Sequence, residues 1–164
     1  MPTPSLLSAE SNKTLQSAVA SELYASALYK SLSNQLQRLG YFGAQKFFAA
    51  ESAHELDHYQ LIADYMSDMG GMAKIPTVPA PEEKIEGLRD SIEAAFDTEL
   101  QLMRDYAQWY AECKCEITKQ FLLQFIEHQR KSVGEFGDLI SRLDRAGTDV
   151  CALLMIDTEL GAKQ

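Results

Sequence analysis

Four long stretches of apolar residues repeating every three or four positions constrain the fold of this chain most strongly. Residues at that spacing share one face of a helix, and the face must pack against other helices. Proline and glycine are sparse within the stretches and gather between them, as helix boundaries require. The sequence therefore predicts an all-α chain with long helices near 10–38, 42–69, 83–112 and 117–146, and a short one near 149–160.

The topology follows from the connection between the second and third stretches. Residues 70–82 begin with two glycines and contain three prolines, which predicts an extended segment. Thirteen extended residues reach about 45 Å at most, and the second helix would be about 42 Å long. The connection can therefore cross the whole length of a bundle. We expect a single domain over 1–164, a four-helix bundle with one long crossover, a short fifth helix and a loose tail over about 1–9.

Charge and cysteine usage exclude several classes of protein. The formal net charge of −9 argues against nucleic-acid binding, which needs a basic face. No stretch has the apolar length of a membrane span, and the start of the chain lacks the features of a signal peptide. The three cysteines are an odd number, which favours a reducing, cytoplasmic location. Two of them form Cys113-x-Cys115, too few ligands for a typical thiolate metal site.

Each apolar face carries polar residues near its middle. These are Glu22 on the first helix, Glu55 with His58 on the second, Glu99 on the third and Gln129 on the fourth. Any one of them alone would more often be a solvated or hydrogen-bonded side chain. Carboxylates that meet inside a bundle repel one another unless protons or a cation neutralise them. Because carboxylate and imidazole ligands suit iron, the joint pattern predicts a dinuclear iron site of the kind built in bundle cores.

The second helix offers two E-x-x-H pairs, in the stretch ESAHELDH at 51–58. Glu51 with His54 and Glu55 with His58 both have the spacing that places two side chains on one helix face. The apolar face favours the second pair, because Glu51, Glu55 and His58 lie along it while His54 lies beside it. We treat Glu51 and His54 as weaker metal-ligand candidates.

Four segments together resemble the ferritins, specifically the haem-free bacterial type, over nearly the whole chain. They are ELYASALY at 22–29, KFFAAESAHELDHYQLIADYMSDMGG at 46–71, FLLQFIEHQ at 121–129 and LLMIDTEL at 153–160. The resemblance implies a ferritin-like bundle and a homo-oligomeric cage of twenty-four subunits. It also implies an iron-storage function, in which each subunit oxidises two Fe²⁺ ions with O₂ or H₂O₂ and passes Fe³⁺ to a mineral inside the cage.

The resemblance also implies a role for each site residue. Glu22 and His58 would hold one iron and Glu99 the other, with Glu55 bridging the two. Gln129 would lie close to the pair. Tyr29 would form a hydrogen bond nearby or donate an electron to the reaction.

Two departures from related patterns lead to further expectations. Bacterioferritin carries a second E-x-x-H on its fourth helix and a haem-binding Met after the bridging Glu, but this chain has Glu127-His128-Gln129-Arg130 and Leu56 there. We therefore expect no haem. Where many bacterial ferritins build a third iron site from glutamates, this chain has His54, His128, Lys131 and Ser132. We expect that site to be absent or altered, with His54 and His128 approaching each other and modulating the pair. His128, like His54, is a weaker metal-ligand candidate.

Three other functions remain open on the sequence. A rubrerythrin-type di-iron oxidase or peroxidase would act without storing iron. Such proteins usually add Cys-x-x-Cys pairs and an E-x-x-H on another helix, and this chain has neither. A DNA-protecting mini-ferritin places its ligands between subunits and often has a basic tail, whereas this chain is acidic and carries its candidate ligands within one subunit. An inert bundle would have solvated carboxylates. Iron oxidation and iron retention per assembly distinguish all of these.

Overall fold

The computed structural model describes residues 4–163, which form five helices and, within that range, no strand. The helices are α1 (Ala9–Leu39), α2 (Phe42–Asp68), α3 (Leu88–Glu112), α4 (Glu116–Ala146) and α5 (Val150–Ala162). None of these helices combines the length and apolar character needed to cross a membrane. The predicted all-α class is confirmed.

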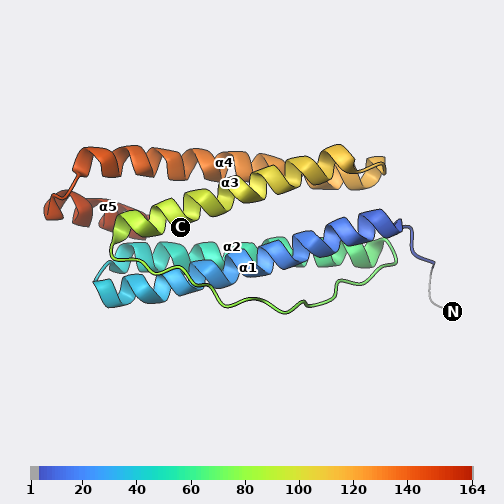
Figure 1. Ribbon diagram of the computed structural model, residues 1–164, viewed down its shortest axis with the longest axis horizontal. Helices are drawn as coiled ribbons and strands as arrows, with labels where there is room; N and C mark the ends of the chain where they lie inside the picture. The colour runs from blue at the N-terminus through green and yellow to red at the C-terminus, as the bar shows by residue number, and fades with distance from the viewer. Residues whose placement is uncertain (1–3, 164) are drawn as a thin grey trace.

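The four long helices form a bundle with one long crossover, as predicted (Figure 1). Helices α1 and α2 run in opposite directions, as do α3 and α4. The segment after α2 runs back along the outside of the bundle, so α3 starts at the end where α2 started. Helix α5 lies across that same end, beside the turn between α1 and α2.

The third helix begins at Leu88, five residues later than the expected start at 83. The side chain of Gln35 on α1 explains the difference. Its Nε2 donates to the Glu83 carbonyl at 2.8 Å, and its Oε1 accepts from the Ile85 amide at 3.0 Å. These bonds hold the backbone extended alongside α1, so the crossover continues to Gly87.

The segment before α1 is held in place rather than loose. The Leu6 amide donates to the Met69 carbonyl at the end of α2, at 2.8 Å. Ser8 then caps α1, its hydroxyl accepting from the Ser11 amide at 3.0 Å, which satisfies one of the free amides of the first turn. Residues 1–3 of the expected tail lie outside the described part of the chain.

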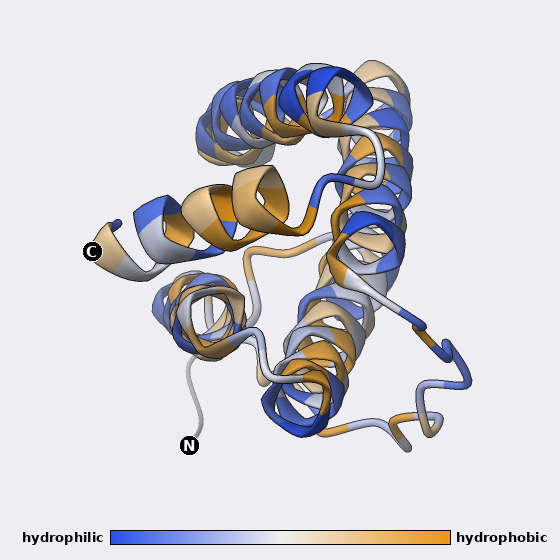
Figure 2. Cartoon of the chain, turned by 90° about the vertical axis from the view of Figure 1, so that its left-hand side faces the viewer, coloured by the Kyte–Doolittle hydropathy of each residue, from blue (hydrophilic) through white to orange (hydrophobic). Residues whose placement is uncertain are grey.

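The bundle has two apolar cores separated by a polar layer. One core lies towards α5 and includes Leu36, Phe48, Ile92 and Leu139. The other lies towards the opposite end and includes Leu15, Ile62, Leu102 and Phe125. Figure 2 looks along the helices and shows apolar residues gathered on their inner faces. On α2, α3 and α4, the polar residue singled out in the sequence lies between the segments that build the two cores, and on α1 Glu22 lies near the boundary between them.

Helix α5 is fastened to the start of α2 by a buried carboxylate. Asp157 accepts from the amides of Ala44 at 2.7 Å and Gly43 at 3.2 Å, which are free amides at the start of α2. The contact needs a glycine, because a Cβ at Gly43 would lie 1.8 Å from the Asp157 carbonyl oxygen. Asp157 thus supplies a helix cap from another element, which stabilises both.

Candidate metal centre

The polar layer contains three carboxylates and an amide that are closed off from solvent. Glu22, Glu55, Glu99 and Gln129 each have 0% of their surface exposed, and each comes from a different long helix. Burying charged groups without partners is costly. Their partners therefore decide what the layer can do.

Two buried tyrosines bind two of the carboxylates in a crossed arrangement. Tyr29 on α1 donates its hydroxyl proton to Glu99 Oε1 on α3, and Tyr106 on α3 donates to Glu22 Oε1 on α1. Burial, followed by the nearby carboxylates, raises the pKa of both phenols well above the usual value. Both tyrosines therefore remain protonated donors, and each fixes one oxygen of its carboxylate.

His58 joins the carboxylates of the first and second helices. Its Nδ1 lies 2.8 Å from Glu55 Oε2 and 3.6 Å from Glu22 Oε2. Burial alone would lower the pKa of His58, but its interactions with these two carboxylates outweigh burial and raise the pKa to about 10. Glu22, Glu55 and His58 therefore form one cluster of interacting ionisable groups.

Each of the three carboxylates keeps one oxygen without a hydrogen-bond partner. These are Glu22 Oε2, Glu55 Oε1 and Glu99 Oε2, all buried, and both amide atoms of Gln129 are likewise unpaired. Buried polar atoms are normally satisfied. Several buried carboxylate oxygens without partners in one layer are therefore typical of a cation-binding site.

Burial and mutual repulsion shift the pKa values of the three carboxyl groups. Burial raises the pKa of Glu55 well above its usual range, with the Glu22 charge adding to the effect. Burial also raises the pKa of Glu99, to about 7. For Glu22, burial acts in the same direction, but interactions with neighbouring side chains, that with His58 foremost, outweigh it and lower the pKa. The layer therefore holds protons that a metal ion would displace.

His128 lies against the cluster. Its ring contacts that of His58 edge-on, with the ring centroids 4.2 Å apart. Burial, with the positive charge of His58, lowers the pKa of His128 to about 4, so its imidazole is neutral at ordinary pH. One ligand atom each from Glu55, His58 and His128 lie within 4.8 Å of one another.

The other E-x-x-H pair lies at the edge of the layer. His54 Nδ1 is 3.4 Å from Glu51 Oε1, and 55% of the His54 side chain is exposed, against 13% for His58. Burial raises the pKa of Glu51, but no hydrogen bond joins Glu51 to the three central carboxylates among the described residues. The helix thus turns one pair inward and leaves the other beside solvent.

Tyr106 is the site residue that reasoning from sequence missed. A signal was present, because Tyr106 follows Glu99 by seven residues as Tyr29 follows Glu22. Seven residues are about two helical turns, so both tyrosines share a face with their carboxylates. Each tyrosine, however, binds the carboxylate of the other helix, a pairing that only the packing of α1 against α3 determines.

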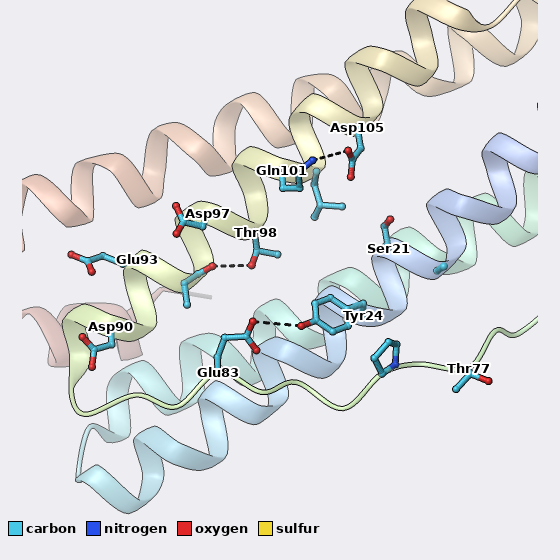
Figure 3. A pocket seen from close by; sticks show the side chains of 14 residues that line it. Ser21, Tyr24, Thr77, Glu83, Asp90, Glu93, Asp97, Thr98, Gln101 and Asp105 are labelled. Carbon is cyan, nitrogen blue, oxygen red and sulfur yellow. Dashed lines mark hydrogen bonds between the residues drawn. The ribbon is translucent and has the colours of Figure 1, made fainter.

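A surface groove of about 830 Å³ lies away from this centre, between α1, α3 and the crossover (Figure 3). Acidic side chains line α3 along it, including Asp90, Glu93, Asp97 and Asp105. Glu93 and Asp97 are exposed and the other two are half-buried. The groove is therefore a solvated acidic surface, unlike the closed carboxylate layer inside the bundle.

The donor set in the layer fits iron. Carboxylate oxygens with imidazole nitrogen are ligands that Fe²⁺ accepts readily. The unpaired oxygens of Glu22, Glu55 and Glu99 come from three helices, and a Glu on several helices with an E-x-x-H pair is the ligand pattern of dinuclear sites in such bundles.

Comparisons with known proteins identify the family of this chain. Residues 12–146 match a family described as "Ferritin-like domain". The "Bacterial non-heme ferritin" of Escherichia coli is 27% identical over 158 residues, covering 94% of this chain and 96% of the relative. The "Ferritin" of Pacifastacus leniusculus is 31% identical over 146 residues, covering 85% and 81%.

The fold also matches solved structures. An open-pore ferritin from the archaeon Archaeoglobus fulgidus superposes with a TM-score of 0.93 over 96% of this chain and 98% of that chain, at 23% identity. At that identity the likeness speaks for the fold alone. Together with the family match over residues 12–146 and the bacterial relatives, it shows that this chain belongs to the ferritin family and is of the bacterial non-haem type.

Proposed function

We propose that this protein is an iron-storage and detoxification ferritin whose buried carboxylate layer oxidises Fe²⁺ at a dinuclear ferroxidase centre. The observation that carries the proposal is the set of unpaired buried oxygens on Glu22, Glu55 and Glu99, beside His58. Iron is the substrate, and oxygen or peroxide takes its electrons. The bacterial non-haem relatives support the same function.

Each residue of the layer has a role that follows from its contacts. Glu22 and His58 hold one Fe²⁺, Glu99 holds the second, and Glu55 bridges the two. Gln129 offers its unpaired amide beside the pair. Tyr29 and Tyr106 position Glu99 and Glu22 through their hydrogen bonds. Carboxylate ligands stabilise the ferric product more than the ferrous substrate, so binding itself assists oxidation.

Several wider features belong to the same proposal. The product would move into the interior of a homo-oligomeric cage of twenty-four subunits. No haem would bind, because Leu56, 47% exposed, stands where a haem-ligating Met would be. The cysteines at 113, 115 and 151 are free, in keeping with a reducing cytoplasm.

Aerobic Fe²⁺ loading tests the function. We expect the protein to oxidise Fe²⁺ rapidly and to retain many iron ions per subunit through size-exclusion chromatography. Glu55→Gln should slow the initial oxidation at least tenfold, because the bridging carboxylate is lost. Asp57→Asn, an exposed neighbour on the same helix, is the matched control and should oxidise iron normally. Rapid oxidation without retained iron would instead indicate a non-storing oxidase of rubrerythrin type.

A further inference from the structure

A second imidazole lies next to the proposed iron position, and the ligand set above does not use it. Ligand atoms of Glu55, His58 and His128 lie within 4.8 Å of one another. The two imidazole rings stand nearly perpendicular, at 77°, so they meet edge to face rather than stacking. His58 comes from α2 and His128 from α4, so the two imidazoles approach the layer from different helices.

The His128 imidazole is not committed to a strong interaction elsewhere in the described chain. Its hydrogen-bond contact is with the Ser132 hydroxyl on its own helix, at 3.5 Å, which is the outer limit for such a bond. His54 differs, because it is mostly exposed and is paired with Glu51. His128 is thus the imidazole that is free to bind an ion at the layer.

We propose that His128 is a metal ligand, adding a second imidazole to the iron position held by Glu22, Glu55 and His58. This inference rests on the proposed function of the centre. Metal–nitrogen bonds are about 2.1 Å long, so two ligands of one cation lie at most about 4.2 Å apart. The three ligand atoms are within 4.8 Å of one another, and small side-chain rotations bring them into that range.

The second imidazole makes the two iron positions chemically unequal. One has two nitrogen donors, while the other has only the oxygens of Glu55, Glu99 and Gln129. Imidazole is neutral and suits divalent Fe²⁺ and Zn²⁺, whereas carboxylate charge favours the trivalent product. The nitrogen-rich position therefore favours the ferric product less strongly than the all-oxygen position does. It also binds Zn²⁺ more tightly than Fe²⁺, which makes zinc a competitor of the substrate there.

Zinc binding to the full-length, metal-free protein tests the assignment without relying on activity. In a crystal structure with Zn²⁺, anomalous density should mark an ion about 2.1 Å from one nitrogen each of His58 and His128. In solution, calorimetric titration should show that His128→Ala weakens this Zn²⁺ site at least tenfold. Gln124→Ala, at an exposed position on the same helix as His128, is the matched control and should leave the affinity of this site unchanged. Light scattering should show that both variants assemble like the wild type.

The outcomes separate this inference from the function on which it rests. Zinc bound by Glu55 and His58 with His128 out of reach, and equal affinity in His128→Ala, would overturn the role of His128 and leave the ferroxidase centre standing. Zinc absent from Glu55 and His58 altogether would overturn both. The crystal structure uses the wild-type protein, so it decides the question even if a variant assembles poorly.

Discussion

At the scale of single residues, the same side chain takes different roles according to its neighbours. Burial acts to raise the pKa of both Glu22 and Glu99. For Glu22, interactions with His58 and Tyr106 outweigh burial and lower the pKa, whereas for Glu99 burial prevails and raises it. The sequence could predict that these residues face the interior, because their spacing along the helix determines it. It could not predict that Tyr106 binds Glu22 rather than a residue on its own helix, because that depends on how α1 and α3 pack.

The two E-x-x-H pairs give a residue-scale prediction. His58→Ala should abolish rapid oxidation of the first iron, because it removes the imidazole that lies 2.8 Å from Glu55. His54→Ala should leave the rate nearly unchanged, because that side chain is mostly exposed. Stopped-flow absorbance of ferric product measures both. The opposite ranking would place the centre one helical turn away, at Glu51 and His54.

The raised pKa of Glu99 predicts how the stability of the metal-free protein depends on pH. In the folded chain Glu99 keeps its proton up to about pH 7, while the usual value is 4.5. Between these pH values the folded state binds more protons than the unfolded state, so this group lowers the free energy of unfolding as pH rises. The slope is at most about 1.4 kcal/mol per pH unit.

Glu99→Gln should remove that slope, because the amide does not titrate. Urea unfolding of chelator-treated protein at fixed concentration, from pH 5 to pH 8, measures it. Glu127→Gln is the matched control, since Glu127 is exposed on α4 and pairs with Arg130. A slope that is unchanged in Glu99→Gln would assign the pH dependence to another group of the layer, such as Glu55, whose pKa is also raised.

At the scale of elements, the helices were predictable from periodicity, but the start of α3 and the contact that holds the tail were not. The third helix starts late because Gln35, more than forty residues earlier in the chain, binds the backbone before it. The tail is held because Leu6 bonds to the end of α2. Both effects are long-range contacts, and local sequence carries no signal for them.

The docking of α5 gives an element-scale prediction. Asp157→Ala removes the carboxylate that caps Gly43 and Ala44, at a cost of about 1 kcal/mol. Hydrogen exchange at those two amides should accelerate, as measured by mass spectrometry of peptides from the start of α2. Asp138→Ala, at an exposed position on α4, should leave their exchange unchanged. Equal exchange in both variants would mean that α5 does not protect the start of α2.

At the scale of the whole molecule, the bundle is two apolar cores with a polar layer between them. The cores tie the four helices together on both sides of the layer, so the helices hold the carboxylates close to one another despite their repulsion. The periodicity of the apolar faces predicted this arrangement along each helix. The periodicity does not predict how subunits assemble, because the interfaces form only between copies of the chain.

The cage is therefore a whole-molecule prediction. Light scattering and electron microscopy of the purified protein should find a hollow particle of twenty-four subunits, because storage needs an enclosed volume. A monomer or dimer as the stable species in solution would contradict storage, although such a protein could still oxidise iron.

The absence of haem is a second prediction for the whole molecule. A haem absorbance band in the purified protein would contradict it.

The central claim is that the buried layer binds and oxidises a pair of iron ions. A crystal structure of the protein soaked aerobically in Fe²⁺, with anomalous data collected at the iron edge, tests it most directly. We expect two adjacent iron peaks, one contacting Glu22 and His58 and the other Glu99, with Glu55 between them. Iron found only on the outer surface, with the layer empty and Glu22, Glu55 and Glu99 still unpaired, would contradict it.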